Sequence, residues 1–157
     1  MVELYIVTGL PGSGKSTWCR ENAVKLNAVI INKDALRTMI RGEYFFDPKW
    51  EPLIHKFSVK MTTVSLLRGL NVIIDETNVT AERRRQWVSL AKSVISEVRV
   101  ICVWCTENVN NLKNRENGLR GISLEKWAEV IEGMKVKFQE PSLSEGFNEI
   151  MRYSFKP

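Results

Sequence analysis

The residues best suited to chemistry lie together near the start of the sequence, in Gly9-Leu10-Pro11-Gly12-Ser13-Gly14-Lys15-Ser16-Thr17. This segment matches G-x-x-x-x-G-K-S, the pattern of a phosphate-binding loop, or P-loop. Its glycines let the backbone fold closely around a phosphate, and the helix that follows adds partial positive charge at its start. We therefore expect ATP or another nucleoside triphosphate to contact Gly9, Gly12, Ser13, Gly14, Lys15, Ser16 and Thr17.

Two side chains of this loop have distinct expected tasks. Lys15 can reach the β- and γ-phosphates, and the Ser16 hydroxyl can bind Mg²⁺. The alternative is a glycine-rich turn with a chance Lys-Ser pair. However, the apolar run 2–7 predicts a buried strand before the loop, and residues 16–26 predict a helix after it. Strand, loop and helix in this order are the context that a P-loop requires.

An acid and an arginine follow the second expected strand, residues 28–32. Asp34 and Arg37 are three residues apart, so they share one face of the helix that begins there. Asp34 can accept a hydroxyl proton during phosphoryl transfer, and Arg37 can hold an acceptor phosphate or orient the carboxylate. The alternative is an acid at a helix start with a surface arginine as its partner. Beside a P-loop, we favour the catalytic interpretation.

Two acids end the third expected strand, residues 71–75. Asp75 follows four residues that include an apolar run, as in a Walker-B segment, and Glu76 comes directly after it. Such an acid holds Mg²⁺ directly or through water. Adjacent strand residues face opposite ways, so the sequence leaves open whether Asp75 or Glu76 serves the metal.

Three arginines, Arg83, Arg84 and Arg85, fall in the first turn of the helix that Thr80 is expected to cap. Cations at a helix start oppose the helix dipole at a cost of about 0.3–1 kcal/mol each. An anionic ligand would offset that cost. A solvated charge run, partly neutralised by the neighbouring Glu82, is an equally good interpretation.

The segment at about 106–122 is expected to fold over the triphosphate as a lid. It carries Arg115 and Arg120. An arginine in a lid can neutralise the charge that develops on the transferred phosphoryl group. The spacing of the two arginines does not decide between them.

Two further patterns leave alternatives open. The aromatic run Tyr44, Phe45 and Phe46 lies in an expected loop, where it could stack on a base, although filling the core is the favoured interpretation.

Cys102 and Cys105 form a C-x-x-C pattern inside an expected strand. Residues three apart on a strand face opposite sides of the sheet, so we expect structural cysteines and no redox or metal pair.

The composition is that of one globular domain over residues 1–157, with 44% apolar and 26% charged residues. No apolar run approaches the ~20 residues that span a bilayer. The chain enters its first expected strand at once, so we expect no signal peptide and a cytoplasmic location. The net charge of +5 slightly favours an acidic partner such as nucleic acid. The sequence does not indicate an oligomeric state.

Strands and helices are expected to alternate along the chain. Apolar runs predict strands at 2–7, 28–32, 71–75 and 98–103, with a further edge strand within 147–155. Apolar residues at helical spacing predict a long helix over 50–70. The expected fold is therefore α/β: a three-layer P-loop NTPase or kinase fold, with a mainly parallel sheet of four to five strands and helices on both faces.

Three segments together resemble the kinase domain of phage-type polynucleotide 5′-kinases: residues 9–18, residues 32–37 (Asn-Lys-Asp-Ala-Leu-Arg) and residues 77–84 (Thr-Asn-Val-Thr-Ala-Glu-Arg-Arg). The resemblance implies transfer of the ATP γ-phosphate to the 5′-hydroxyl of DNA or RNA, with Mg²⁺. In it, Asp34 would be the general base, and Arg120 would contact the transition state. The residues expected at the nucleic acid are Arg37, Thr77, Asn78, Arg83 and Arg84.

Two other functions remain open from the sequence. One is a P-loop kinase of a small hydroxylated molecule such as a nucleoside, sugar or antibiotic. The other is a nucleotide-dependent nucleic-acid-binding protein without a phosphoryl acceptor. The charge balance and Arg37 favour a polyanionic acceptor over a small molecule.

Overall fold

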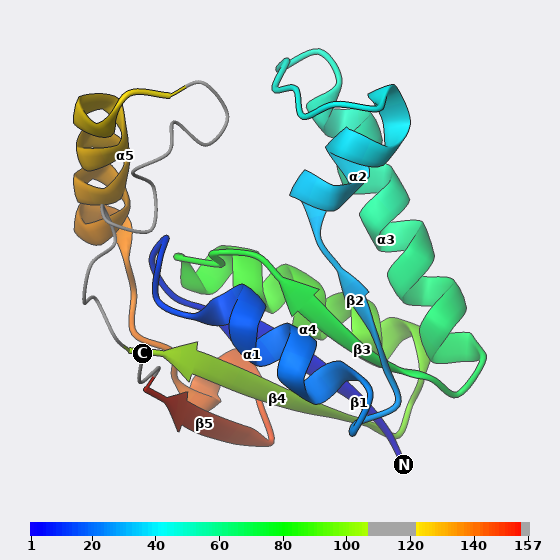
Figure 1. The fold of residues 1–157 in the computed structure, drawn as a ribbon. Coiled ribbons are helices and arrows are strands. Elements are labelled where there is room, and N and C mark those ends of the chain that lie inside the picture. Colours follow the sequence, from blue (N-terminus) through cyan, green and yellow to red (C-terminus); the bar gives the residue numbers. More distant parts are fainter. Residues whose placement is uncertain (107–121, 155–157) are drawn as a thin grey trace.

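The computed structural model describes residues 1–106 and 122–154, which form an α/β domain around one parallel sheet (Figure 1). The sheet has the strand order β2-β3-β1-β4-β5, and each pair of neighbours is parallel. Its strands are β1 (Val2–Thr8), β2 (Ala28–Ile31), β3 (Asn71–Asp75), β4 (Val98–Cys105) and β5 (Glu149–Tyr153). The predicted fold class is confirmed, and the fifth strand lies at an edge as expected.

Helices cover both faces of this sheet. Helix α1 (Lys15–Ala23) packs on one face, and α4 (Ala81–Val94) packs on the other. The remaining elements are α2 (Lys33–Arg41), α3 (Glu51–Leu67), α5 (Leu124–Lys137) and the short 3₁₀ helix η3 (Leu143–Glu145). In Figure 1, α5 lies on the side of the molecule opposite α2 and α3.

The strands are apolar along their length because both of their faces are buried. Alternate residues of β1 and β4 point into two separate cores. Cys102 belongs to the core beneath α4, whereas Cys105 belongs to the core beneath α1. All three cysteines are buried and free. The expectation that the C-x-x-C pattern places its two sulfurs on opposite sides is therefore confirmed.

Helix ends follow local capping rules. Asn32 accepts a hydrogen bond from the backbone N–H of Ala35 (2.9 Å), and Thr80 accepts one from Arg83 (3.3 Å). Such caps satisfy backbone donors that the first helical turn leaves open. They fix the start of α2 directly after β2 and the start of α4 after the short segment 76–80 that follows β3, so both helices begin on the carboxyl side of the sheet.

Helix α3 is present as predicted, but its buried face is not the most apolar one. The buried residues are Ile54, Ser58, Thr62 and Leu66. The Ser58 and Thr62 hydroxyls donate to carbonyls of their own helix, at 2.7 and 2.8 Å, which makes their burial tolerable. Large apolar side chains point outward instead, at Trp50, Leu53, Phe57, Met61, Val64 and Leu67.

No helix in the described ranges is long and apolar enough to cross a membrane.

Candidate active site

The P-loop connects β1 to α1 at the carboxyl edge of the sheet, where α/β proteins hold their ligands. Gly9 has φ 154°, and a Cβ there would lie 2.6 Å from Ser13 Oγ and 2.7 Å from the Cys105 carbonyl oxygen. Only glycine fits such a position without displacing the loop. The Gly9 N–H also donates to the Thr77 carbonyl (3.1 Å), which ties the P-loop to the segment after β3.

The loop is built to receive phosphate oxygens. Helix α1 begins at Lys15, directly after Gly14, so no side chain caps its first turn. The N–H groups of that turn are therefore available to an anion. Among the residues that the structure describes, the buried Ser13 hydroxyl has no hydrogen-bond partner. Lys15 is buried and its ammonium donates to the Leu10 carbonyl (2.8 Å), so its charge stays over the loop.

Asp34 and Arg37 lie together on α2, as their spacing predicts. The Arg37 guanidinium donates to Asp34 Oδ1 at 2.6 Å. The same guanidinium makes two bonds to the Glu51 carboxylate, from Nε at 2.9 Å and from a terminal nitrogen at 2.6 Å. Hydrogen bonding to Glu51 is the main cause that raises the pKa of Arg37 above its usual value. Arg37 is therefore a fixed cation held between two acids.

Sequence reasoning missed Glu51. It lies in the first turn of α3, next to Pro52, where an acid is usual because it complements the helix dipole. Nothing in the local pattern connects it to Arg37, which is 14 positions earlier. The two parallel hydrogen bonds of such a pair fix the orientation of the guanidinium plane, and the carboxylate also neutralises its charge.

The two acids after β3 point in different directions. Asp75 accepts from the Asn32 side chain (2.9 Å) and from the Cys19 thiol of α1. Glu76 pairs instead with Lys33 of α2 (3.4 Å). Burial raises the pKa of Glu76 above the usual carboxyl value, against the charges of Lys33, Arg83 and Arg37, which lower it. Asp75 thus lies on the α1 side of the sheet, the side that carries Ser16.

Burial also affects the pKa of Cys19, the cysteine of α1. Desolvation is the first cause that raises the pKa of Cys19, and the nearby Asp75 adds to it. Cys19 therefore stays a neutral thiol beside the Asp75 carboxylate.

The donors at the P-loop and at the end of β3 are oxygen atoms of the kind that bind magnesium. In residues 1–106 and 122–154, no three His, Cys, Asp or Glu side chains converge as a metal cage. Magnesium instead commonly uses one or two protein ligands and completes its shell with phosphates and water. A serine hydroxyl and a single carboxylate at the P-loop fit that requirement.

Two of the residues expected at the nucleic acid are buried, and that expectation is corrected. Arg84 is fully buried and its guanidinium is bound in two places by Glu145, at 2.8 Å each. Its third bond goes to the Asn78 carbonyl at 2.9 Å. Asn78 is 1% exposed, and its amide donates to the Val7 carbonyl at 2.8 Å. Both side chains hold the core together and do not reach solvent.

Two further residues expected at the nucleic acid reach the surface at least in part. Arg83 is exposed at the start of α4, and Thr77 is partly exposed. The Thr77 backbone carbonyl accepts from both Gly9 and the Thr8 hydroxyl, so the segment's main chain is anchored. Arg115, Arg120 and most of the expected lid lie outside the described residues.

The aromatic run after α2 does not form a core. Phe45 packs edge-on against Trp50, with ring centroids 5.7 Å apart, and Arg41 covers it at 4.9 Å. Phe46 lies in contact with Arg37, whose guanidinium carbon is 5.6 Å from the ring centroid. One ring of this loop, that of Phe46, therefore lies against the Asp34–Arg37 pair, whereas Phe45 packs on Trp50 and Arg41.

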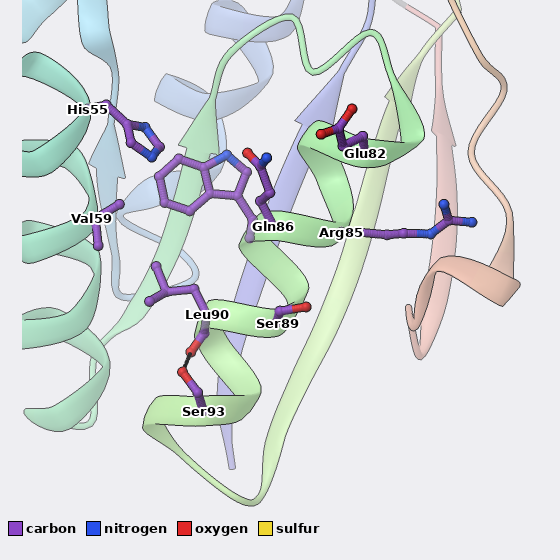
Figure 2. A pocket seen from close by; sticks show the side chains of 9 residues that line it. His55, Val59, Glu82, Arg85, Gln86, Ser89, Leu90 and Ser93 are labelled. Atoms are coloured by element: carbon purple, nitrogen blue, oxygen red, sulfur yellow. Dashed lines mark hydrogen bonds between the residues drawn. The ribbon is translucent and has the colours of Figure 1, made fainter. Parts of the chain in front are cut away.

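A groove of about 680 Å³ runs along the outer side of α4, next to His55 and Val59 of α3 (Figure 2). Its remaining lining comes from Glu82, Arg85, Gln86, Trp87, Ser89, Leu90 and Ser93. Figure 2 shows the Arg85 side chain extending away from His55, so the groove's charges do not converge. None of its residues belongs to the P-loop or to the Asp34–Arg37 pair, and we assign it no catalytic role.

A family model described as an AAA domain (AAA_33) matches residues 4–141. The chain belongs to this family. The match covers the P-loop, the Asp34–Arg37 pair and the end of β3. The resemblance to polynucleotide kinases that the motifs indicate is also confirmed by the named relatives of this AAA domain.

Two curated proteins illustrate that relationship. The AAA domain is 25% identical over 154 residues to a bifunctional polynucleotide phosphatase/kinase of Schizosaccharomyces pombe, covering 98% of this chain and 34% of that protein. It is 30% identical over 142 residues to an L-seryl-tRNA(Sec) kinase of Methanococcus maripaludis, covering 88% of this chain and 53% of that protein. The chain thus spans about a third to a half of the length of these relatives.

Solved structures agree with the fold. A structure of a Pnkp1/Rnl/Hen1 RNA repair complex matches the AAA domain at 26% identity and a TM-score of 0.67, covering 88% of this chain and 46% of that one. A Chaetomium thermophilum Kti12 structure with ADP-AlF3 matches at 18% identity and the same TM-score, covering 97% and 89%. At that identity the second match supports the fold alone.

Proposed function

We propose that this protein is a phosphotransferase that moves the γ-phosphate of ATP to the 5′-hydroxyl end of a polynucleotide. The observation that carries the proposal is the contact between Asp34 and Arg37 at 2.6 Å, on the helix that begins at the carboxyl edge of the sheet. A P-loop alone is shared by many functions. A carboxylate with a fixed cation beside it is what a hydroxyl acceptor requires.

The residues divide the reaction between them. Asp34 takes the proton from the acceptor hydroxyl while the hydroxyl oxygen attacks the γ-phosphorus. The bond between the γ-phosphorus and the β–γ bridging oxygen then breaks, which releases ADP. Lys15 and the N–H groups of the P-loop neutralise the phosphate charge. Arg37 orients Asp34 and attracts the acceptor phosphate. Arg115 and Arg120 are our candidates for the charge on the transferred group.

Magnesium bound to the triphosphate would withdraw charge from the β- and γ-phosphates. Ser16 and Asp75 are the residues that would hold it. Asp75 is preferred over Glu76 because it faces α1, whereas Glu76 is paired with Lys33 of α2.

The named relatives support an acceptor that contains nucleic acid. One is called a polynucleotide phosphatase/kinase, and the other is called an L-seryl-tRNA(Sec) kinase. The second name defines a second candidate function, because the identity to that protein is 30%. In that case the acceptor hydroxyl would belong to a residue attached to RNA and not to the polynucleotide end.

The test is transfer of labelled γ-phosphate from ATP, with Mg²⁺, to a short single-stranded oligonucleotide with a 5′-hydroxyl. Controls are the same oligonucleotide with a 5′-phosphate, a free nucleoside and a seryl-tRNA. Label on the 5′-hydroxyl oligonucleotide alone supports the proposal. Label on seryl-tRNA alone overturns the proposal, and so does more label on the free nucleoside than on the 5′-hydroxyl oligonucleotide.

Asp34→Asn connects that activity to the site. We expect the rate to fall about 100- to 10,000-fold, the usual contribution of a general base, while ATP binding is retained. Glu43→Gln is the matched control, because Glu43 is an exposed acid just beyond α2. An unchanged rate in Asp34→Asn would remove Asp34 from the mechanism.

A further inference from the structure

Phe46 is an exposed aromatic ring next to the proposed catalytic pair. It lies in the loop between α2 and α3, at the top of the molecule in Figure 1. Its side chain is 62% exposed, whereas the neighbouring Phe45 is partly buried against Trp50. The favoured sequence interpretation, that the aromatic run fills the core, is therefore wrong for Phe46.

The position of the ring follows from Arg37. The guanidinium carbon of Arg37 is 5.6 Å from the Phe46 ring centroid, and the same guanidinium bonds Asp34 Oδ1 at 2.6 Å. Arg37 itself is held by Glu51 at 2.6 and 2.9 Å, so this geometry does not depend on the mobility of a free side chain. The ring thus lies one side chain away from the carboxylate that would receive the acceptor proton.

The chemistry of this arrangement suits a nucleobase. An exposed aromatic ring stacks on bases of any sequence, because every base has a π-face. Leaving most of a phenyl ring in water is unfavourable, and a stacked base would remove that cost. A nucleobase offers a flat π-face to such a ring, which a sugar or another small polyol lacks.

We propose that Phe46 stacks on the base of the 5′-terminal nucleotide of the acceptor, so that the enzyme recognises a nucleotide and not a bare hydroxyl. This inference rests on the proposed function and specifies its substrate. It adds a base-recognition element to a site whose other residues contact only hydroxyl and phosphate. Because stacking does not read hydrogen bonds, the preference holds for all four bases.

The experiment compares two oligonucleotides that differ only in the terminal base. One carries a normal 5′-terminal nucleotide, and the other carries an abasic residue with the same 5′-hydroxyl. We expect removal of the base to lower kcat/KM of the wild-type protein about 5- to 150-fold, the range of one stacking contact. Phe46→Leu should show the same loss on the normal oligonucleotide and no further loss on the abasic one.

Two variants control the interpretation. Phe46→Tyr keeps the ring and should retain the base preference. Phe57→Leu alters another exposed phenylalanine, on α3, and should behave as wild type. A binding readout avoids turnover: 2-aminopurine at the 5′ position should lose fluorescence on the Asp34→Asn protein, and should lose less when Phe46→Leu is added.

Each other outcome is decisive. Equal rates on normal and abasic ends overturn the base-stacking inference and leave the kinase proposal standing. A slower Phe46→Leu reaction on both oligonucleotides also overturns it, since the ring would then act only by packing Arg37. Absence of transfer to any oligonucleotide by the wild-type protein refutes the proposed function itself, before any variant is compared.

Discussion

At the scale of single residues, the position of Arg37 depends on an acid outside the motif that contains it. Glu51 takes two of the guanidinium nitrogens and Asp34 takes one. Asp34 by itself is partly exposed, with 38% of its side chain accessible. The ion pair with Glu51 of α3 therefore determines which way the Arg37 guanidinium faces. Arg37 in turn sets the direction of the Asp34 carboxylate. We therefore expect Glu51 to act as a positioning residue.

Replacing Glu51 by Ala should lower kcat while leaving the KM for ATP nearly unchanged. A misplacement of about 1 Å can cost roughly 100-fold in rate, so we expect a loss of that order. Glu51→Gln keeps one acceptor oxygen and should recover part of the rate. Steady-state kinetics with the 5′-hydroxyl oligonucleotide provide the measurement. A rise in the KM for ATP with kcat unchanged would place Glu51 in nucleotide binding instead.

The residues of the site show what local sequence can and cannot reveal. Asp34 and Arg37 were predicted because three positions on a helix bring two side chains together. Glu51 and Glu145 were not, since they meet their arginines across 14 and 61 positions. The run Arg83–Arg85 looks uniformly polar, but a helix turns one of three successive residues inward. Only the core around Glu145 shows that this residue is Arg84.

At the scale of secondary structure, the apolar patterns predicted where strands and helices lie better than they predicted which side of a helix is buried. The apolar runs located four strands because strands covered on both faces need no alternation. The spacing of apolar residues located α3 but left its buried side open. Ser58 and Thr62 can lie on that side because their hydroxyls donate to carbonyls of the same helix. No sequence signal marks that a serine has a partner inside its own helix. The buried side of α3 required the structure.

The two faces of α3 provide a matched pair of substitutions. Ile54 is fully buried and Leu53, its neighbour, is 39% exposed. Ile54→Ala should lower the free energy of unfolding by about 2–5 kcal/mol, because it leaves a cavity. Leu53→Ala should change it by less than about 1 kcal/mol. Urea unfolding followed by circular dichroism measures both, and equal effects would contradict the assigned orientation of α3.

At the scale of the whole molecule, the raised pKa of Glu76 makes the stability of the fold depend on pH. Glu76 is partly buried directly after β3, and desolvation raises its pKa despite the nearby Lys33, Arg83 and Arg37. A carboxyl whose pKa is higher in the folded than in the unfolded state binds its proton more readily when folded. Its contribution to stability is present at low pH and is lost as the pH rises from about 4.5 through the raised pKa.

Glu76→Gln should therefore unfold at a higher temperature than wild type at pH 7, since glutamine resembles the neutral acid. This difference in unfolding temperature should shrink as the pH falls. It should vanish below about pH 4.5, where Glu76 is protonated in the folded and in the unfolded state. Thermal unfolding between pH 4 and 8 measures it, with the exposed Glu129→Gln as control. A lower unfolding temperature at pH 7 would mean that the Lys33 pair outweighs the burial of Glu76.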